Sequence, residues 1–155
     1  MKNFSKTVLL TGLFVGTTDI VSAFITQWVK TGKFAGKMFD YIAGGALGLE
    51  TSMQGGNATA FLGLFFHYFI AMAFTLLFFA IFAKIKFLAY DKFLIGMLYA
   101  VFVNVVMDQV ILPMSRLPRG SFDLSAAFIG WIVFGLVFGI PIAYNAYKYY
   151  GVRSE

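Results

Sequence analysis

Apolar residues run along this chain in four long stretches separated by polar or glycine-rich segments. The stretches cover residues 8–29, 58–83, 93–112 and 124–147, and they lack the alternation of apolar and polar positions that is typical of half-buried strands. A helix needs about 20 mostly apolar residues to cross the roughly 30 Å hydrocarbon core of a bilayer. The pattern therefore predicts four transmembrane helices and excludes the strands of a membrane β-barrel.

The connection between the first two stretches has a helical pattern of its own. Phe34, Met38 and Ile42 recur at the spacing of one helix face. The polar residues of the same segment lie on another side: Lys33, Lys37 and Asp40. An apolar face opposite a charged face is typical of a helix that lies in the membrane interface, so we expect a short interfacial helix over residues 34–49.

Prolines interrupt the pattern at two places. Pro113, Pro118 and Gly120 follow the third stretch and predict a turn-rich link there rather than a helix. Pro141 lies inside the fourth stretch, where its ring and its missing N–H are expected to kink the helix and free one backbone carbonyl.

Composition indicates the same class of protein. Of the 155 residues, 60% are hydrophobic and 12% are charged, whereas soluble domains carry about 25% charged residues. So few charges do not cover a water-exposed surface, and we expect an all-α integral membrane protein, a four-helix bundle that forms a single transmembrane domain over residues 1–155. The chain has no Cys, which excludes disulfides and thiolate chemistry.

The net charge of +5 comes from Lys and Arg residues that stand largely between the apolar stretches. At those positions they meet lipid headgroups, so we expect the lipid bilayer, and no nucleic acid, as the partner of this charge. The side of the membrane that would hold both termini carries more Lys and Arg than the opposite side. The positive-inside rule therefore favours cytoplasmic N- and C-termini.

Four polar residues stand inside the predicted spans, where an ionised group costs about 2.5–3.5 kcal/mol at the helix centre. They are Asp19, His67, Asn104 and Asp108. At about 1.5 Å per residue, the first three lie within about 3 Å of one depth. Asn104 and Asp108 share a helix face because they are one turn apart. We expect these side chains to converge as an intramembrane polar site.

Two interpretations of these residues stay open. Asp19 and His67 either share a proton near neutral pH, as in proton relays, or form a structural hydrogen bond that fixes the helix register. Asp108 is nearer the interface, where it is either solvated or paired with Arg116.

Glycines at a four-residue spacing allow helices to approach closely. This spacing occurs in the first and fourth stretches, at Gly12, Gly16, Gly135 and Gly139. We interpret these glycines as contacts between helices of one chain, with a homo-oligomer interface as the alternative.

Metal and catalytic chemistry have little support in the sequence. One His, no Cys and separated Asp residues do not form a zinc site within one chain. Neither a nucleophile elbow nor a phosphate-binding glycine loop occurs. We therefore expect no metal, no cofactor and no catalytic residue.

Four short motifs carry a resemblance to a known family. They are Thr18-Asp19-Ile20, Tyr41-Ile42-Ala43-Gly44-Gly45, His67-Tyr68-Phe69-Ile70-Ala71 and Leu112-Pro113-Met114-Ser115-Arg116-Leu117-Pro118. Together they resemble a group of small four-helix bacterial inner-membrane proteins to which no activity is assigned. The resemblance implies a bacterial cytoplasmic membrane and a four-helix fold. The family pattern has Asn where this chain has Asp108, which argues against a role that requires a carboxylate there.

Three functions fit these expectations. The first is transport or channel-like passage of protons, ions or a small solute past the polar site, through an oligomer because four packed helices fill their own centre. The second is a structural or accessory subunit that binds a partner membrane protein. The third, least expected, is a lipid- or cofactor-binding membrane protein.

Overall fold

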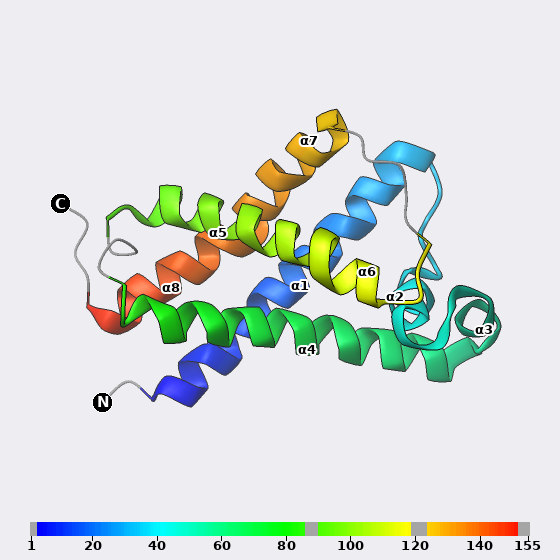
Figure 1. Cartoon of the computed structure of the whole chain (residues 1–155), viewed down its shortest axis with the longest axis horizontal. Coiled ribbons are helices and arrows are strands. Elements are labelled where there is room, and N and C mark those ends of the chain that lie inside the picture. The colour runs from blue at the N-terminus through cyan, green and yellow to red at the C-terminus, as the bar shows by residue number, and fades with distance from the viewer. Residues whose placement is uncertain (1–2, 86–89, 119–123, 152–155) are drawn as a thin grey trace.

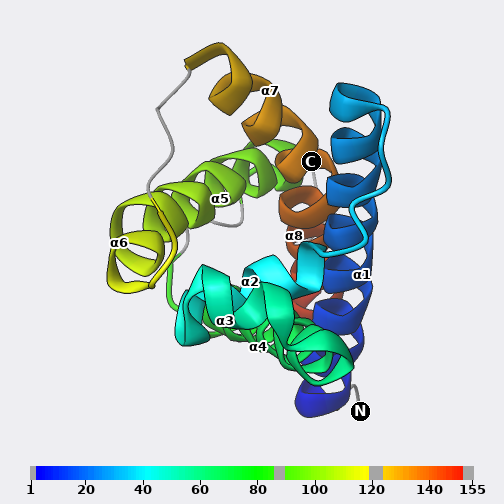
Figure 2. The same ribbon diagram turned by 90° about the vertical axis from the view of Figure 1, so that its right-hand side faces the viewer.

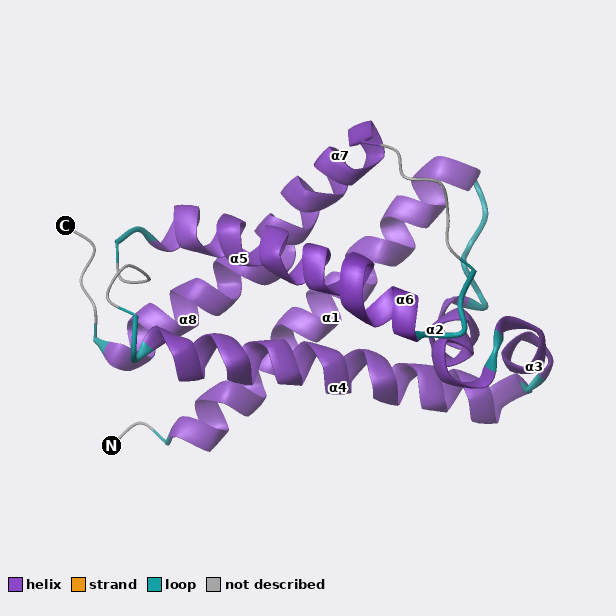
Figure 3. Ribbon diagram, in the orientation of Figure 1, coloured by secondary structure: helices purple, strands orange, loops and turns teal. Residues whose placement is uncertain are grey.

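The computed structural model describes residues 3–85, 90–118 and 124–151, without the side chains of residues 125 and 126. Within these ranges every regular element is a helix, and loops and turns join the helices (Figure 3). Among the described residues, four helices are long and apolar enough to cross a membrane, over Phe4–Thr31, Gly56–Phe82, Lys92–Met114 and Ala127–Tyr150. The prediction of four long apolar helices is confirmed, with bounds that differ by a few residues.

The first two spans are uninterrupted α-helices, α1 (Phe4–Thr31) and α4 (Gly56–Phe82). α1 begins ahead of its apolar stretch because the side chain of Asn3 caps it, accepting the N–H of Lys6 at 3.2 Å. It ends at Gly32, whose left-handed φ of 66° turns its N–H onto the carbonyl of Trp28. Capping, rather than hydrophobicity, therefore sets the ends of this helix.

The third and fourth spans each contain a π-helical segment. The third comprises α5 (Lys92–Val106), η2 (Met107–Ile111) and α6 (Leu112–Met114). The fourth comprises α7 (Leu124–Phe134), η3 (Gly135–Gly139) and α8 (Ile140–Tyr150). In both spans the residue before a proline donates its N–H to a carbonyl five residues back, Leu112 to Met107 and Ile140 to Gly135.

The π-helix η2 corrects the prediction for Pro113. The sequence places this proline in a turn-rich link, but it lies in the last helical turn of the third span. The wide turn ahead of it relieves the usual clash of a proline with the preceding turn. The helix ends at Met114 because Ser115 adopts an extended conformation with ψ 169°. Pro118 lies in the link as expected, and Gly120 lies outside the described residues.

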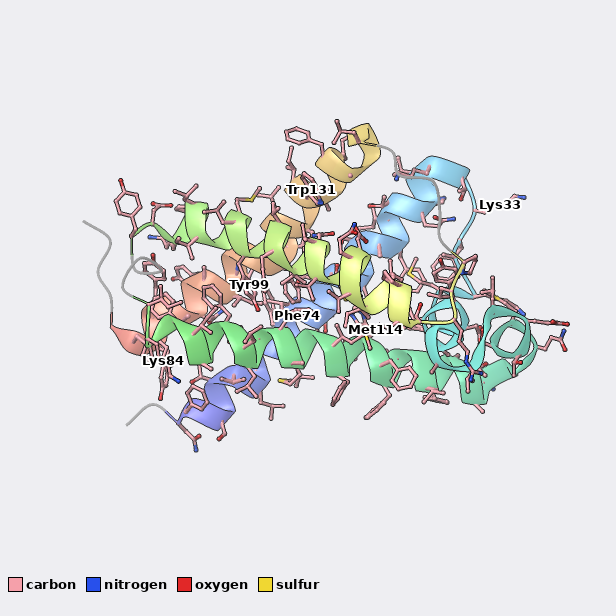
Figure 4. All side chains as sticks on the ribbon, in the orientation of Figure 1. Lys33, Phe74, Lys84, Tyr99, Met114 and Trp131 are labelled. Carbon is pink, nitrogen blue, oxygen red and sulfur yellow. The ribbon has the colours of Figure 1, made fainter. Side chains whose placement is uncertain are left out.

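The helices pack as one bundle in which the closest neighbours are not always consecutive in sequence (Figures 1 and 2). α1 packs on α4 and α8, and α5 packs on α8 and η3. α4 packs more closely on α1, and on the connector between α1 and α4, than on α5. Where α4 and α5 do meet, the hydroxyl of Tyr99 donates to the carbonyl of Phe74 at 2.6 Å (Figure 4). The Tyr99 ring also lies against the ring of Phe78.

The four glycines at helix-packing spacing each face another helix of the same chain. Their neighbours are Met72 for Gly12, Tyr68 for Gly16, Met97 for Gly135 and Gly96 for Gly139. A Cβ at Gly12 would lie 2.7 Å from the Sδ of Met72, so a larger residue there would require the flexible side chain of Met72 to move. Because the chain's own helices occupy these faces, the glycines give no support to the alternative of an oligomer interface.

The first connector forms two helices, α2 (Met38–Leu47) and α3 (Leu49–Gln54), rather than one. They are divided at Gly48, whose φ of 89° is a conformation that side chains other than glycine rarely adopt. α2 packs along α4, where the absence of a side chain at Gly63 admits the backbone carbonyl of Phe39. The interfacial position of this segment stays a prediction.

Asp40 corrects the expected polar face of α2. The sequence groups it with Lys33 and Lys37 on a charged face, but it is 6% exposed and accepts a hydrogen bond of 2.5 Å from the hydroxyl of Thr59 on α4. Thr59 is itself buried, so each polar group satisfies the other. One charged residue of the amphipathic pattern therefore anchors the helix to the bundle.

Candidate functional site

A pocket of about 400 Å³ lies inside the bundle and takes its walls from all four spans. We call it the polar pocket, because it is lined by Asp19, His67, Asn104 and Asp108. The rest of its wall is largely apolar and includes Ile70, Phe74 and Phe138. The fold thus gathers at one cavity the four polar residues that the sequence analysis selects.

His67 joins the first two spans at this pocket. Its Nε2 lies 2.7 Å from the backbone carbonyl oxygen of Gly16 and donates its hydrogen there, since a carbonyl only accepts. In the neutral ring Nδ1 is then an acceptor, and protonation at Nδ1 produces a cation that keeps the bond to Gly16. The hydrogen bond therefore fixes the ring in place and leaves it able to bind a proton.

Asp19 and Asn104 are placed on the same cavity from α1 and α5. Asp19 follows Gly16 by one helical turn, and its half-buried carboxyl is close enough to His67 for their charges to interact. The half-buried Asn104 donates its side-chain N–H to the carbonyl of Ala100 at 2.9 Å, which holds the amide against its own helix. The pocket therefore has fixed polar groups on at least two of its walls.

Asp108 is the exposed member of the set. Because it both lines the pocket and reaches the surface, the pocket is open on that side. Asp108 belongs to η2, and Phe138, which also lines the pocket, belongs to η3. Single π-helical turns of this kind occur frequently at functional sites.

Sequence reasoning misses the residues that close the pocket toward the first connector. Met38 and Ile42 of α2 both line it. Their helical spacing was the available signal, and it indicates an apolar face correctly. A face buried against protein and a face buried in lipid have the same periodicity, so the pattern does not distinguish the two.

The chemistry of the pocket favours positive charge. Two carboxylates, those of Asp19 and Asp108, outnumber the single imidazole of His67. Over the described part of the chain, no group of three His, Asp or Glu side chains gathers closely enough to hold a metal ion. The arrangement suits a proton or an organic cation that has both a charged group and an apolar part.

By length and composition, four helices in the described part of the chain could cross a membrane, which indicates a multi-pass membrane protein. Comparisons with protein-family models, with curated proteins and with solved structures give no match. The family resemblance of the four motifs is therefore neither supported nor refuted, and functional reasoning starts from the polar pocket.

Proposed function

We propose that this protein transports a small, positively charged solute across the cytoplasmic membrane of a bacterium, and that the polar pocket is its solute-binding site. The observation that carries the proposal is the meeting of Asp19, His67, Asn104 and Asp108 at one cavity. Ionisable groups inside membrane spans are costly to insert, and those that face a cavity mark solute or proton pathways.

The size of the pocket favours a solute over a bare ion. About 400 Å³ falls within the range of roughly 300–1,000 Å³ that is usual for small-molecule sites. Such sites combine an apolar wall with a few polar groups that fix the orientation of the ligand. Here the carboxylates would take the charged group, and Ile70 and Phe74 would contact its carbon skeleton.

Asp19 and His67 supply a means of coupling solute movement to protons. Both can bind a proton, and their charges interact across the pocket. A cation that takes its place beside Asp19 competes with the proton on that carboxylate, so the binding of one favours release of the other. This reciprocal competition is what exchange of a cation for a proton requires.

The pocket is built by a single chain, so the proposal needs no oligomer to complete the site. Assembly into an oligomer stays a prediction. The proposal keeps both termini in the cytoplasm, because the side of the membrane that holds the termini carries more Lys and Arg than the opposite side.

The test is solute uptake into proteoliposomes. Choline is a suitable probe because its permanent charge keeps it from crossing the bilayer unaided. Uptake of radiolabelled choline is measured with the vesicle interior acidic and with no proton gradient, while a trapped pH-sensitive dye follows proton release. We expect protein-dependent uptake that is faster with an acidic interior and that is accompanied by proton efflux.

The variants Asp19→Asn and His67→Ala are each expected to slow uptake about tenfold, which corresponds to ~1.4 kcal/mol. Glu50→Gln is the matched control, because Glu50 is an exposed carboxylate in α3 outside the pocket. If both pocket variants transport like the wild type, or if neither choline nor protons move, transport is rejected. An accessory role would then be tested by co-purification of a partner.

A further inference from the structure

Positive charge gathers at the end of the bundle where the chain begins and ends (Figure 1). α1 and α5 start there, and α4 and α8 end there. The described basic residues at these helix ends are Lys6, Lys84, Lys92 and Lys148. Asp91 is the acidic residue that the described part of the chain places there, and it caps α5 by accepting the N–H of Leu94 at 2.7 Å. Among the residues that the structure describes at this end, lysines therefore outnumber carboxylates.

A second pocket, of about 790 Å³, opens at this end between α1, α8 and the first turn of α5. We call it the basic pocket, because Lys92 and Lys148 stand in its wall. The ammonium of Lys92 is held 5.4 Å from the centre of the Phe93 ring, which lines the same pocket. Thr7 and Asn145 add uncharged polar groups.

The wall of the basic pocket changes from polar to apolar with depth. Lys92 is the first residue of α5, and Lys148 is close to the end of α8, so both charges lie at helix ends. Two turns further into the bundle, about 10 Å at 1.5 Å per residue, the wall is formed by Phe14 and Pro141. Leu10 and Phe14 are 56% and 55% exposed, so the apolar part of the wall is open at the surface of the bundle.

We infer that the basic pocket binds an anionic phospholipid, with its phosphate beside Lys92 and Lys148 and an acyl chain along Leu10 and Phe14. Basic pockets between membrane helices on the cytoplasmic side take headgroups of this kind. The two lysines favour an anionic headgroup over a zwitterionic one, which carries its own positive charge. The apolar wall below them favours a lipid over a free phosphate ester, which would leave that wall uncovered.

This site is independent of the polar pocket, since the two share no lining residue. A phosphate bound in the basic pocket would contact both Lys92 in the first turn of α5 and Lys148 near the end of α8. A lipid bound there would therefore stabilise the packing of α5 on α8, on which the third and fourth spans depend.

Native mass spectrometry of the detergent-purified full chain tests the inference. Dioleoylphosphatidylglycerol and dioleoylphosphatidylcholine are titrated separately, and the bound lipid is counted on the protein. We expect tighter binding of phosphatidylglycerol, weakened about fivefold by the loss of each lysine and about 25-fold in the double variant Lys92→Gln/Lys148→Gln. Lys148→Gln alone, at an exposed position, provides a second variant that keeps the fold.

The control is Lys30→Gln/Lys33→Gln, which removes the same charge from exposed positions in and just after the last turn of α1. This is the opposite end of the molecule, where Figure 4 labels Lys33. It should bind phosphatidylglycerol like the wild type. Equal affinity for the two lipids, or an equal loss in the control, would overturn the inference. Displacement of the lipid by millimolar glycerol 3-phosphate would also overturn it, because the headgroup alone would then be the ligand.

Discussion

The hydroxyl of Thr18 in α1 donates to the backbone carbonyl of Val137 at 2.7 Å. Val137 is the residue whose carbonyl a regular helix would pair with the N–H of residue 141, and Pro141 has no N–H. The free carbonyl that the sequence predicts in the fourth span is therefore taken up by the first span. This bond ties α1 to η3 at the proline.

Removal of this bond is expected to destabilise the fold by a modest amount. Thr18→Val keeps the shape of the side chain and leaves the carbonyl of Val137 without its partner from α1. Hydrogen bonds between membrane helices contribute about 0.6 kcal/mol on average and up to about 1.7 kcal/mol. We expect a loss of about 1 kcal/mol, measured as the free energy of unfolding in mixed micelles of detergent and sodium dodecyl sulfate.

Thr75→Val is the control for this change. Thr75 is fully buried, and its hydroxyl donates at 2.8 Å to Ala71 within its own helix. Its loss removes no contact between helices, so we expect a smaller change in the unfolding free energy. Equal losses in the two variants would show that the bond between α1 and η3 contributes nothing of its own.

The apolar pattern predicts the helices well because length and hydrophobicity alone decide whether a segment can cross a bilayer. It does not predict the π-helices, since these depend on how η2 and η3 pass Pro113 and Pro141. It also places Asp40 on the wrong side of α2. The burial of Asp40 depends on one hydroxyl, that of Thr59 in another helix, and a contact of this kind leaves no periodic signal.

Gly63 is expected to be intolerant of any side chain. A Cβ there would overlap the carbonyl oxygen of Phe39, so Gly63→Ala must push α2 away from α4. Overpacking of this kind costs about 1–3 kcal/mol. We expect a lower melting temperature and faster proteolysis within α2 and α3.

Gly130→Ala is the matched control, since a Cβ at Gly130 in α7 meets nothing within 4 Å. Alanine also has the higher helix propensity, by up to about 1 kcal/mol. The control should therefore melt at or above the temperature of the wild type. A protease-resistant Gly63→Ala protein would contradict the close approach of α2 to α4.

The hydrogen bond between Thr59 and Asp40 predicts different effects for loss of its donor and for a change of its acceptor. Thr59→Val removes the donor and leaves a buried carboxylate unsatisfied, which costs about 1–3 kcal/mol. Asp40→Asn keeps a carbonyl oxygen that can accept the same bond and removes the charge. We therefore expect Thr59→Val to lower the unfolding free energy more than Asp40→Asn, with α2 the first element to become protease-sensitive. The reverse order would show that Asp40 is held by something other than Thr59.

The sequence predicts how deep the polar residues of the candidate site lie within their helices. Asp19, His67 and Asn104 fall near the middle of their helices, and the constant helix rise predicts their shared height. Which way each one faces depends on helix rotation, which here follows from contacts such as that of Gly16 with Tyr68. The hydrogen-bond partner of His67 is a backbone carbonyl rather than a side chain. Because every residue has a backbone carbonyl, the sequence does not predict which one accepts this bond.

Water in the polar pocket can be tested directly because the chain has no cysteine. Asn104→Cys places a thiol on the pocket wall, whereas Leu98→Cys places one on the same helix at a position that is 49% exposed on its outer surface. Only a hydrated thiol ionises to the reactive thiolate. In membranes, a water-soluble methanethiosulfonate should therefore modify the pocket variant and leave the Leu98→Cys protein, whose thiol we expect to face lipid, unmodified.

The charge of the pocket adds a second comparison within the same experiment. Asp19 and Asp108 raise the local concentration of cations in the pocket. A cationic methanethiosulfonate that carries a trimethylammonium group should therefore react with Asn104→Cys about tenfold faster than an anionic one that carries a sulfonate group. Adding Asp19→Asn to the cysteine variant should narrow that difference while leaving the thiol accessible. If the anionic reagent reacts as fast as the cationic one, the pocket does not select positive charge. The proposal that the solute is a cation would then be wrong, even if the pocket contains water.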